Sequence, residues 1–369
     1  MSKHNKLLAL GLLMALLPAV TCNLIGFDFG SSFMKATLVK AGRPFSIIEN
    51  TASQRKTSTM VTIGLENRMY GADSLLEMSK YPKNTFSQLA RTFGQNFDSD
   101  WIAKFKKEYL VFNDYVSDER GFAAWKVTRP ANGDSPVTEE ILYSEEVVAM
   151  MFAYVKMLAE IQAETHVRDC VITIPSWFTY DQRLMIKDAA ELANLKVLQL
   201  VHENTAAAVM YGIDNKVEPG QSKIVMFYNM GSMDTEVTIA NYSMFNITDK
   251  KSSPYIEILS EAYDQQLGSQ DLENSLVRIL ARHFNEMSER QGKEDVMNNE
   301  RAVARLKKDA IKAIEVLSAN KFASIKVPEL LDYVTLQFNL PREEFETENE
   351  KFFARVNGPI DEALNKAGL

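Results

Sequence analysis

Two short polar turns in this sequence carry the residue types that could bind a phosphate. The first lies in Leu24–Lys40, where an apolar run ends at Asp28, Gly30, Ser31 and Ser32 before a second strand-like run begins. A glycine turn of this kind can offer backbone N–H groups and hydroxyls to a phosphate. Asp28 could hold the water shell of a magnesium ion, which keeps several waters and takes few direct carboxylates. The same pattern also fits an ordinary β-hairpin whose glycine supplies a positive φ.

The second turn lies in Lys223–Asn246 and repeats the design of the first. An apolar run leads to a polar residue at Asn229, then to Gly231 and small polar residues, and a second strand follows. Two copies of such a hairpin indicate a duplicated fold with a ligand between its halves. An accidental similarity between two hairpins is the alternative.

Composition and charge limit the classes of function. The chain has 369 residues, of which 46% are hydrophobic and 24% are charged, which is typical of a globular protein with two or more domains. Its formal net charge of -8 argues against a general nucleic-acid binder, because no basic surplus exists to neutralise phosphates. The histidines form no close-spaced pair and predict no metal-ligand cluster. The sequence contains no G-x-S-x-G elbow and no Walker loop.

Residues 1–22 have the pattern of a signal peptide. Lys3 and Lys6 form a positive start, Leu7–Leu17 is apolar but too short to span a membrane, and small residues end at Cys22. A buried N-terminal helix is the alternative. The mature chain would keep a single cysteine, Cys170, and so no intrachain disulfide. No later stretch is long and apolar enough to span a bilayer, so we expect entry into the secretory pathway without a membrane span.

Two glycosylation sequons lie close together, at Asn241-Tyr242-Ser243 and Asn246-Ile247-Thr248. Sequons are common by chance, and these gain weight from the signal peptide. The sequence therefore predicts a glycoprotein.

The elements around the two turns alternate between strand and helix. Thr179 and Gln182 form a capping-box pattern at the start of one of the helices, and Ser144 is predicted to cap another. This alternation indicates an α/β layer. The predicted order is helix Ser144–His166, strand Cys170–Ile174, helix Thr179–Asn194, strand Lys196–Val201 and helix Thr205–Tyr211.

The remaining segments give a mixed pattern. The predicted elements are a hairpin at Gly64–Tyr70, strand-like runs at Phe105–Val116 and Gly121–Thr128, a loop at Pro130–Pro136, a long helix ending at Met287, an amphipathic helix with a solvated basic face at Arg301–Leu317, and a strand-like run at Ser324–Asn339.

The order of three motifs resembles the ATPase domain of the heat shock protein 70 family. These motifs are IGFDFGSS, the long block VITIPSWFTYDQRLMIKDAAELANLKVLQLVHENTAAAVMYGID, and FYNMGSMDTEV. EVLSANK, ARHFNEM and the signal peptide resemble one branch, the large glucose-regulated (hypoxia up-regulated) chaperones of the ER lumen. The resemblance implies an actin-like, ribonuclease-H-like α/β fold with two lobes that close on Mg-ATP, each lobe having two subdomains.

The resemblance also implies boundaries and roles. Lobe I would have an inner subdomain at 23–57 and 144–216 and an outer one at 58–143, and lobe II an inner subdomain at 217–257 and 350–369 and an outer one at 258–349. Asp28 would act at the magnesium ion through water, and Glu203 near the same water. The implied nucleotide-binding residues are Gly30, Ser31, Ser32, Phe33, Gly231, Ser232, Gly268 and Ser318, and Pro175 would couple nucleotide state to a client domain.

Several positions depart from the family pattern. Asn229 stands where the family has an aspartate, and a neutral amide cannot accept a proton or orient water through charge. Met233 brings a Cβ to a place where glycine lets backbone approach phosphate. Ala90 replaces a lysine that assists hydrolysis, while Ile314 and Glu315 replace basic residues near the adenosine. Phosphate affinity is shared among many groups, whereas hydrolysis depends on a positioned charge.

These features together predict an ATP- or ADP-binding chaperone of the ER lumen with weak or absent hydrolysis, so its status as an enzyme is open. Its expected partners are unfolded clients and the main ER heat shock protein 70, for which it would be a nucleotide exchange factor. The alternatives are a working ATPase chaperone and a scaffold that binds no nucleotide. Because the sequence ends before the family's last adenosine motif and client-binding domain, the resemblance also implies an incomplete chain.

Overall fold

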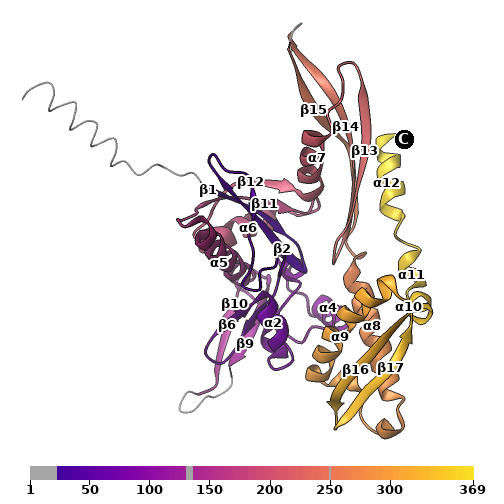
Figure 1. Cartoon of the computed structure of the whole chain (residues 1–369). Coiled ribbons are helices and arrows are strands. Elements are labelled where there is room, and N and C mark those ends of the chain that lie inside the picture. The colour runs from indigo at the N-terminus through magenta and orange to yellow at the C-terminus, as the bar shows by residue number, and fades with distance from the viewer. Residues whose placement is uncertain (1–22, 130–135, 249–250) are drawn as a thin grey trace, which may run out of the picture.

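A computed structural model describes residues 23–129, 136–248 and 251–369 (Figure 1). The predicted signal peptide at 1–22 and nearly all of the predicted loop at Pro130–Pro136 lie outside these residues.

The first lobe is built on a six-stranded sheet with the strand order β12-β11-β1-β2-β3, in which β4 also pairs with β2. The first hairpin is confirmed, since β1 and β2 are antiparallel neighbours. β11 runs parallel to both β1 and β12. The strands are β1 (Asn23–Phe29), β2 (Phe33–Lys40), β3 (Ser46–Ile47), β4 (Thr57–Ser58), β11 (Asp169–Ile174) and β12 (Lys196–His202).

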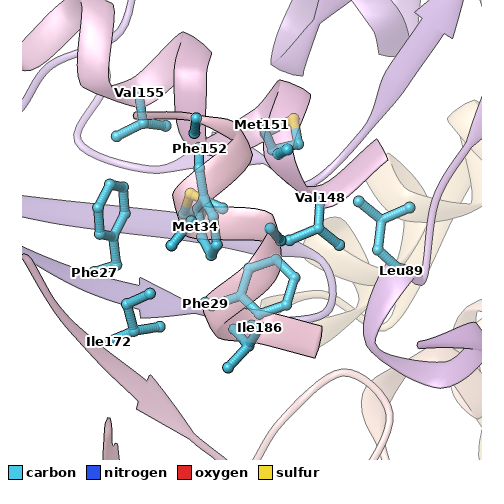
Figure 2. Packing of buried hydrophobic residues seen from close by; sticks show 14 of the residues in the cluster. Phe27, Phe29, Met34, Leu89, Val148, Met151, Phe152, Val155, Ile172 and Ile186 are labelled. Atoms are coloured by element: carbon cyan, nitrogen blue, oxygen red, sulfur yellow. The ribbon is translucent and has the colours of Figure 1, made fainter. Parts of the chain in front are cut away.

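Successive side chains along β1 alternate between the hydrophobic core of this lobe and the opposite, more exposed face. Phe27 and Phe29 point to one face, where both rings pack on Phe152 with centroids 5.1 and 5.4 Å away (Figure 2). Phe152 belongs to α5 (Ser144–Ala163), which packs beside α6 (Tyr180–Leu192). Because successive side chains of a strand point to opposite faces, Asp28 lies on the face away from this core.

The two helix starts differ in how well the sequence predicted them. The capping box of α6 is confirmed, because the backbone N–H of Thr179 donates to Gln182 Oε1 at 2.9 Å and the N–H of Gln182 donates to Thr179 Oγ1 at 3.3 Å. The predicted cap at Ser144 is wrong by one residue. Tyr143 is the cap, and Ser144 Oγ instead donates to the buried carbonyl of Ala123 at 3.1 Å.

One predicted strand-like run in the outer part of the lobe is wrong over most of its length. The run was predicted at Phe105–Val116. Its first residues, up to Tyr109, belong to a helix, α4 (Ser99–Tyr109), and only its last residues enter a strand. The physical reason is the spacing of the aromatic residues Trp101, Phe105 and Tyr109, which are four apart and stack along one helix face at 5.1 Å between successive centroids.

The other outer elements form two three-stranded sheets with flanking helices. The hairpin predicted at Gly64–Tyr70 is confirmed in part, because this range holds the turn and β6, whereas β5 ends just before it. These outer elements are β5 (Val61–Ile63), β6 (Arg68–Tyr70), α2 (Gly71–Glu77), η1 (Pro82–Asn84), β7 (Thr85–Phe86), α3 (Leu89–Thr92), β8 (Asp114–Ser117), β9 (Ala123–Arg129) and β10 (Thr138–Leu142).

The second lobe begins with a three-stranded antiparallel sheet of order β13-β14-β15. Its first two strands, β13 (Ser222–Met230) and β14 (Thr235–Thr248), confirm the second predicted hairpin, whereas β15 (Lys251–Asp264) was not predicted. Two helices, α7 (Glu203–Asp214) and α12 (Gly358–Ala367), cover the two sides of the sheet (Figure 1).

A helical pair and a hairpin complete this lobe. The predicted helix at Arg301–Leu317 is confirmed within α9, whose apolar residues pack against α8 and β16 in a second core. The elements are α8 (Ser269–Asn285), η2 (Ser288–Arg290), η3 (Val296–Asn298), α9 (Glu300–Ala319), β16 (Phe322–Leu331), β17 (Val334–Pro341), α10 (Arg342–Glu348) and α11 (Glu350–Phe353). Among the described residues, no helix has the length and apolarity needed to cross a membrane. The four-subdomain boundaries stay a prediction.

Candidate functional site

The turns of the two hairpins meet between the lobes. Ser32 Oγ, in the turn after β1, donates to Ser232 Oγ, in the turn after β13, at 2.5 Å. Next to this contact lies a cavity of about 400 Å³. Its lining includes Ser31, Ser32 and Phe33 from the first turn and Gln270, Glu273, Ile311 and Glu315 from α8 and α9. The structure therefore brings together the two turns that the sequence singled out.

Asp28 sits at the end of β1 and is already paired with a cation of the chain. The register of the hairpin places Lys35 directly opposite it, and Lys35 Nζ lies 2.5 Å from Asp28 Oδ2. The other carboxylate oxygen, Oδ1, accepts a long bond of 3.5 Å from the hydroxyl of Thr173 on β11. Both side chains of the ion pair are partly exposed on the sheet face opposite the core.

Glu203 is the first residue of α7, and the amide of Asn229 at the end of β13 donates to its Oε2 at 3.0 Å. Burial, together with the smaller effect of the nearby carboxylates of Asp234, Glu236 and Asp28, raises the pKa of Glu203 to about 8. Glu203 is therefore largely protonated at neutral pH. The neutral amide at Asn229 removes what would otherwise be a further repulsion in this acidic cluster.

Two acids at the start of β14 were not predicted as site residues. Asp234 Oδ2 accepts from the indole Nε1 of Trp177 at 2.6 Å, and burial raises the pKa of Asp234. Glu236 Oε1 accepts from the backbone N–H and the hydroxyl of Ser176 at 2.7 and 3.0 Å. Burial raises the pKa of Glu236 to about 7. Because Asp234 and Glu236 are two residues apart, the sequence could have indicated that both side chains lie on the same face. It could not have indicated their partners, which belong to the other lobe.

The second turn is held in place by the start of α8. The N–H groups of Ser269 and Gln270 donate to the carbonyls of Gly231 and Ser232 at 3.0 and 2.8 Å. A Cβ on Gly268 would lie 2.3 Å from the carbonyl oxygen of Ser232, so only glycine permits this approach. The geometry therefore places Gly268 against the second turn, as a residue that positions it.

Met233 and Ala90, two of the departures from the family pattern, are both buried. The side chain of Met233 packs with Phe105 and Tyr109 of α4, and its carbonyl accepts from Arg91 Nη2 at 3.0 Å. Ala90 belongs to the main hydrophobic core of the first lobe. Met233 thus joins the second turn to the first lobe.

The structure brings together only some of the residues that were predicted to surround the nucleoside. Phe33 lines the cavity and carries Lys56 Nζ 4.4 Å from its ring centroid. Gly30 makes the tight turn possible, since a Cβ there would lie 2.5 Å from the carbonyl oxygen of Phe33. Ser318 is not among the residues that line the cavity, and its hydroxyl donates to the carbonyl of Glu315 at 2.7 Å. Glu315, one turn earlier, does line it.

A magnesium ion held by protein carboxylates does not fit this arrangement well. Over residues 23–129, 136–248 and 251–369, no group of three or more His, Cys, Asp or Glu side chains is placed so that it could hold a metal. Asp28, the predicted contact through water, is engaged by Lys35.

Two facing hairpin turns beside an interlobe cavity, each on its own sheet, define a two-lobe α/β protein with a candidate ligand site between its lobes. The chain belongs to the Hsp70 family, since the model for "Hsp70 protein" matches residues 24–369. The predicted actin-like fold of two lobes is confirmed by this match and by the mixed α/β architecture.

Relatives named hypoxia up-regulated protein 1 are similar over nearly the whole chain. The protein from Danio rerio is 33% identical over 97% of this chain and 36% of its own length. That from Xenopus tropicalis is 33% identical over 93% of this chain and 52% of its own length. The Homo sapiens protein is 32% identical over 95% and 34%, respectively. The chain therefore spans about a third to a half of the length of these relatives.

Proposed function

We propose that this chain is the ATP-binding part of a chaperone of the ER lumen that hydrolyses ATP slowly or not at all. The meeting of the two turns at Ser32 and Ser232 carries the proposal, because it forms a clamp from two separate hairpins. Membership of the Hsp70 family supports nucleotide binding, and the predicted signal peptide supports the compartment.

In this proposal the turns at 30–32 and 231–233 bind the phosphates, and Phe33 with the cavity beside α9 holds the nucleoside. Magnesium, when bound to the nucleotide, would supply positive charge to the phosphates. Gly268 and the start of α8 fix the second turn, so that its groups need not reorganise on binding.

Hydrolysis lacks a charged base at the position of Asn229. That side chain donates its amide proton to Glu203, which itself holds a proton at neutral pH because its pKa is about 8. Neither group is then available to accept a proton from water. Ala90 offers no cation to stabilise the charge that develops on the transferred phosphate.

We further propose that the protein binds unfolded clients and promotes nucleotide exchange on the main ER heat shock protein 70. Exchange requires a closed lobe pair as a docking surface but no turnover. Contacts across the turns, such as Trp177 with Asp234 and Arg91 with Met233, support closure by the protein's own side chains.

Two measurements test the central proposal. Equilibrium dialysis with ATP should show saturable binding, and its absence would leave an interaction scaffold as the function. Single-turnover hydrolysis should be far slower than in competent Hsp70 proteins measured in parallel. A comparable rate would show a working ATPase and overturn the proposal of weak hydrolysis.

A further inference from the structure

We propose that Lys35 is a built-in cation of the nucleotide site, which neutralises phosphate charge so that polyphosphate binding does not require a divalent metal ion. This inference rests on the proposed nucleotide binding and names the group that makes it possible. A lysine ammonium is a compact point charge that commonly binds phosphate.

The backbone fixes where this charge lies. Lys35 follows the phosphate-type turn by three residues and is the register partner of Asp28 across the hairpin. Both residues point away from the hydrophobic core, and the Nζ to Oδ2 distance is 2.5 Å. The ammonium therefore stands at the foot of the turn that ends at Ser32, on the face where Asp28 is exposed.

The side of the site beside Asp28 is acidic, whereas two other cations, Lys56 and Lys307, line the cavity beside α9. The carboxyl groups there are Asp28, Glu203, Asp234 and Glu236, and burial first, then the charges of the other three, raises the pKa of Glu203. A polyphosphate entering beside Asp28 would meet repulsion unless that charge is balanced. The guanidinium of Arg91 is directed to the carbonyl of Met233 in the second turn, so it serves the other side of the site.

Each of these carboxyl groups already accepts a hydrogen bond from a donor of the protein, although Glu236 Oε2 is buried without a partner. Asp28 accepts from Lys35, Glu203 from Asn229 and Asp234 from Trp177, while Glu236 accepts from Ser176. Magnesium requires a near-octahedral oxygen shell that includes several waters. Asp28, the acid of the first turn, would meet such a shell in competition with the Lys35 ammonium that already holds its Oδ2. Lys35 supplies positive charge at the first turn without a metal ion.

Calorimetric titration with ATP, ADP and adenosine, each in magnesium and in excess EDTA, tests the inference. We expect chelation to change the ATP dissociation constant of the wild-type chain by less than about threefold. Lys35→Met should bind ATP about tenfold or more weakly in EDTA, because one charge-assisted contact to phosphate is lost. Lys35→Arg should retain most of the affinity.

Adenosine separates a phosphate contact from a structural effect. It carries no phosphate, so Lys35→Met should bind it as the wild type does. The matched control is Lys196→Met. Lys196 is exposed on the same sheet but lies at its opposite end, because it pairs with Asp169, which in turn pairs with Leu24. This variant should bind all three ligands normally.

A second variant keeps the test decisive if Lys35→Met folds poorly, which a thermal melt would show. Asp28→Asn releases Lys35 from its ion pair and should bind ATP in EDTA at least as tightly as the wild type. Weaker binding by Asp28→Asn, or wild-type binding that collapses in EDTA, would overturn the role of Lys35 while leaving nucleotide binding intact. Failure of ATP, ADP and adenosine to bind in any buffer would overturn both proposals.

Discussion

The close approach of Gly268 to the second turn gives the sharpest test of how the site is built. In Gly268→Ala the new Cβ would start 2.3 Å from the Ser232 carbonyl oxygen and 2.6 Å from the Met233 nitrogen. Both neighbours are backbone atoms, so no side chain can rotate away. The turn and the start of α8 must separate by about 1 Å to restore an ordinary contact.

That separation has a cost that can be worked from the contacts. The hydrogen bonds from Ser269 and Gln270 to the turn, at 3.0 and 2.8 Å, would be stretched beyond a useful length. Two lost bonds at about 1 kcal/mol each, with a similar amount of overpacking strain, lower the free energy of unfolding by about 3 kcal/mol. Since the displaced turn is a proposed phosphate contact, we also expect ATP affinity to fall about tenfold or more.

Urea unfolding followed by circular dichroism measures the stability, and calorimetric titration measures the affinity. Gly358→Ala is the matched control, because Gly358 begins α12 and a Cβ there would have no neighbour within 4 Å. That change should be neutral or slightly stabilising, since alanine favours helix. If Gly268→Ala unfolds and binds ATP as Gly358→Ala does, the steric reasoning about the turn is wrong.

Three further changes probe the acidic cluster and the buried end of the second turn. Asn229→Asp replaces the donor to Glu203 with a second carboxylate, so the free energy of unfolding should fall more at pH 8 than at pH 6. Single-turnover hydrolysis should rise in this variant. An unchanged rate would show that another departure from the family pattern limits hydrolysis. Because burial raises the pKa of Glu236 from 4.5 to about 7, its contribution to stability is full below pH 4.5 and is lost as the pH rises through 7. Glu236→Gln should flatten that fall in urea midpoints, and an unaltered pH profile would contradict the assignment. Met233→Ala should lower the free energy of unfolding by about 2–3 kcal/mol through a cavity beside Phe105, whereas a loss under about 0.5 kcal/mol would mean that the aromatic residues collapse to fill it.

The elements that were predictable from the sequence are those whose signal is local. Both hairpins follow from an apolar run, a glycine turn and a second run, and the cap of α6 follows from Thr179 and Gln182. β15 was missed because it opens with polar residues and contains Pro254, which weaken a strand pattern. α4 was misread because its aromatic residues suit a strand by type, although their spacing of four is helical.

The site was harder to predict because its contacts join distant segments. Asp28 and Glu203 were found through motifs, but nothing in the sequence near Asp234 or Glu236 points to Trp177 and Ser176 in the other lobe. A local clue did exist for Lys35. Asp28 and Lys35 flank a hairpin turn at positions that the register must pair, so their ion pair could be inferred once the turn was fixed.

The two turns differ in what positions them and balances their charge. This difference explains why the departures from the family pattern are tolerated together. The second turn has lost an acid at Asn229 and gained a buried anchor at Met233, so it is positioned by protein contacts alone. The first turn keeps its acid at Asp28 but balances it with Lys35. A site with rigid turns can hold a nucleotide, yet the neutral amide of Asn229 supplies no charge to act on water. This combination of residues is the physical basis of our proposal that the chain binds nucleotide without efficient turnover.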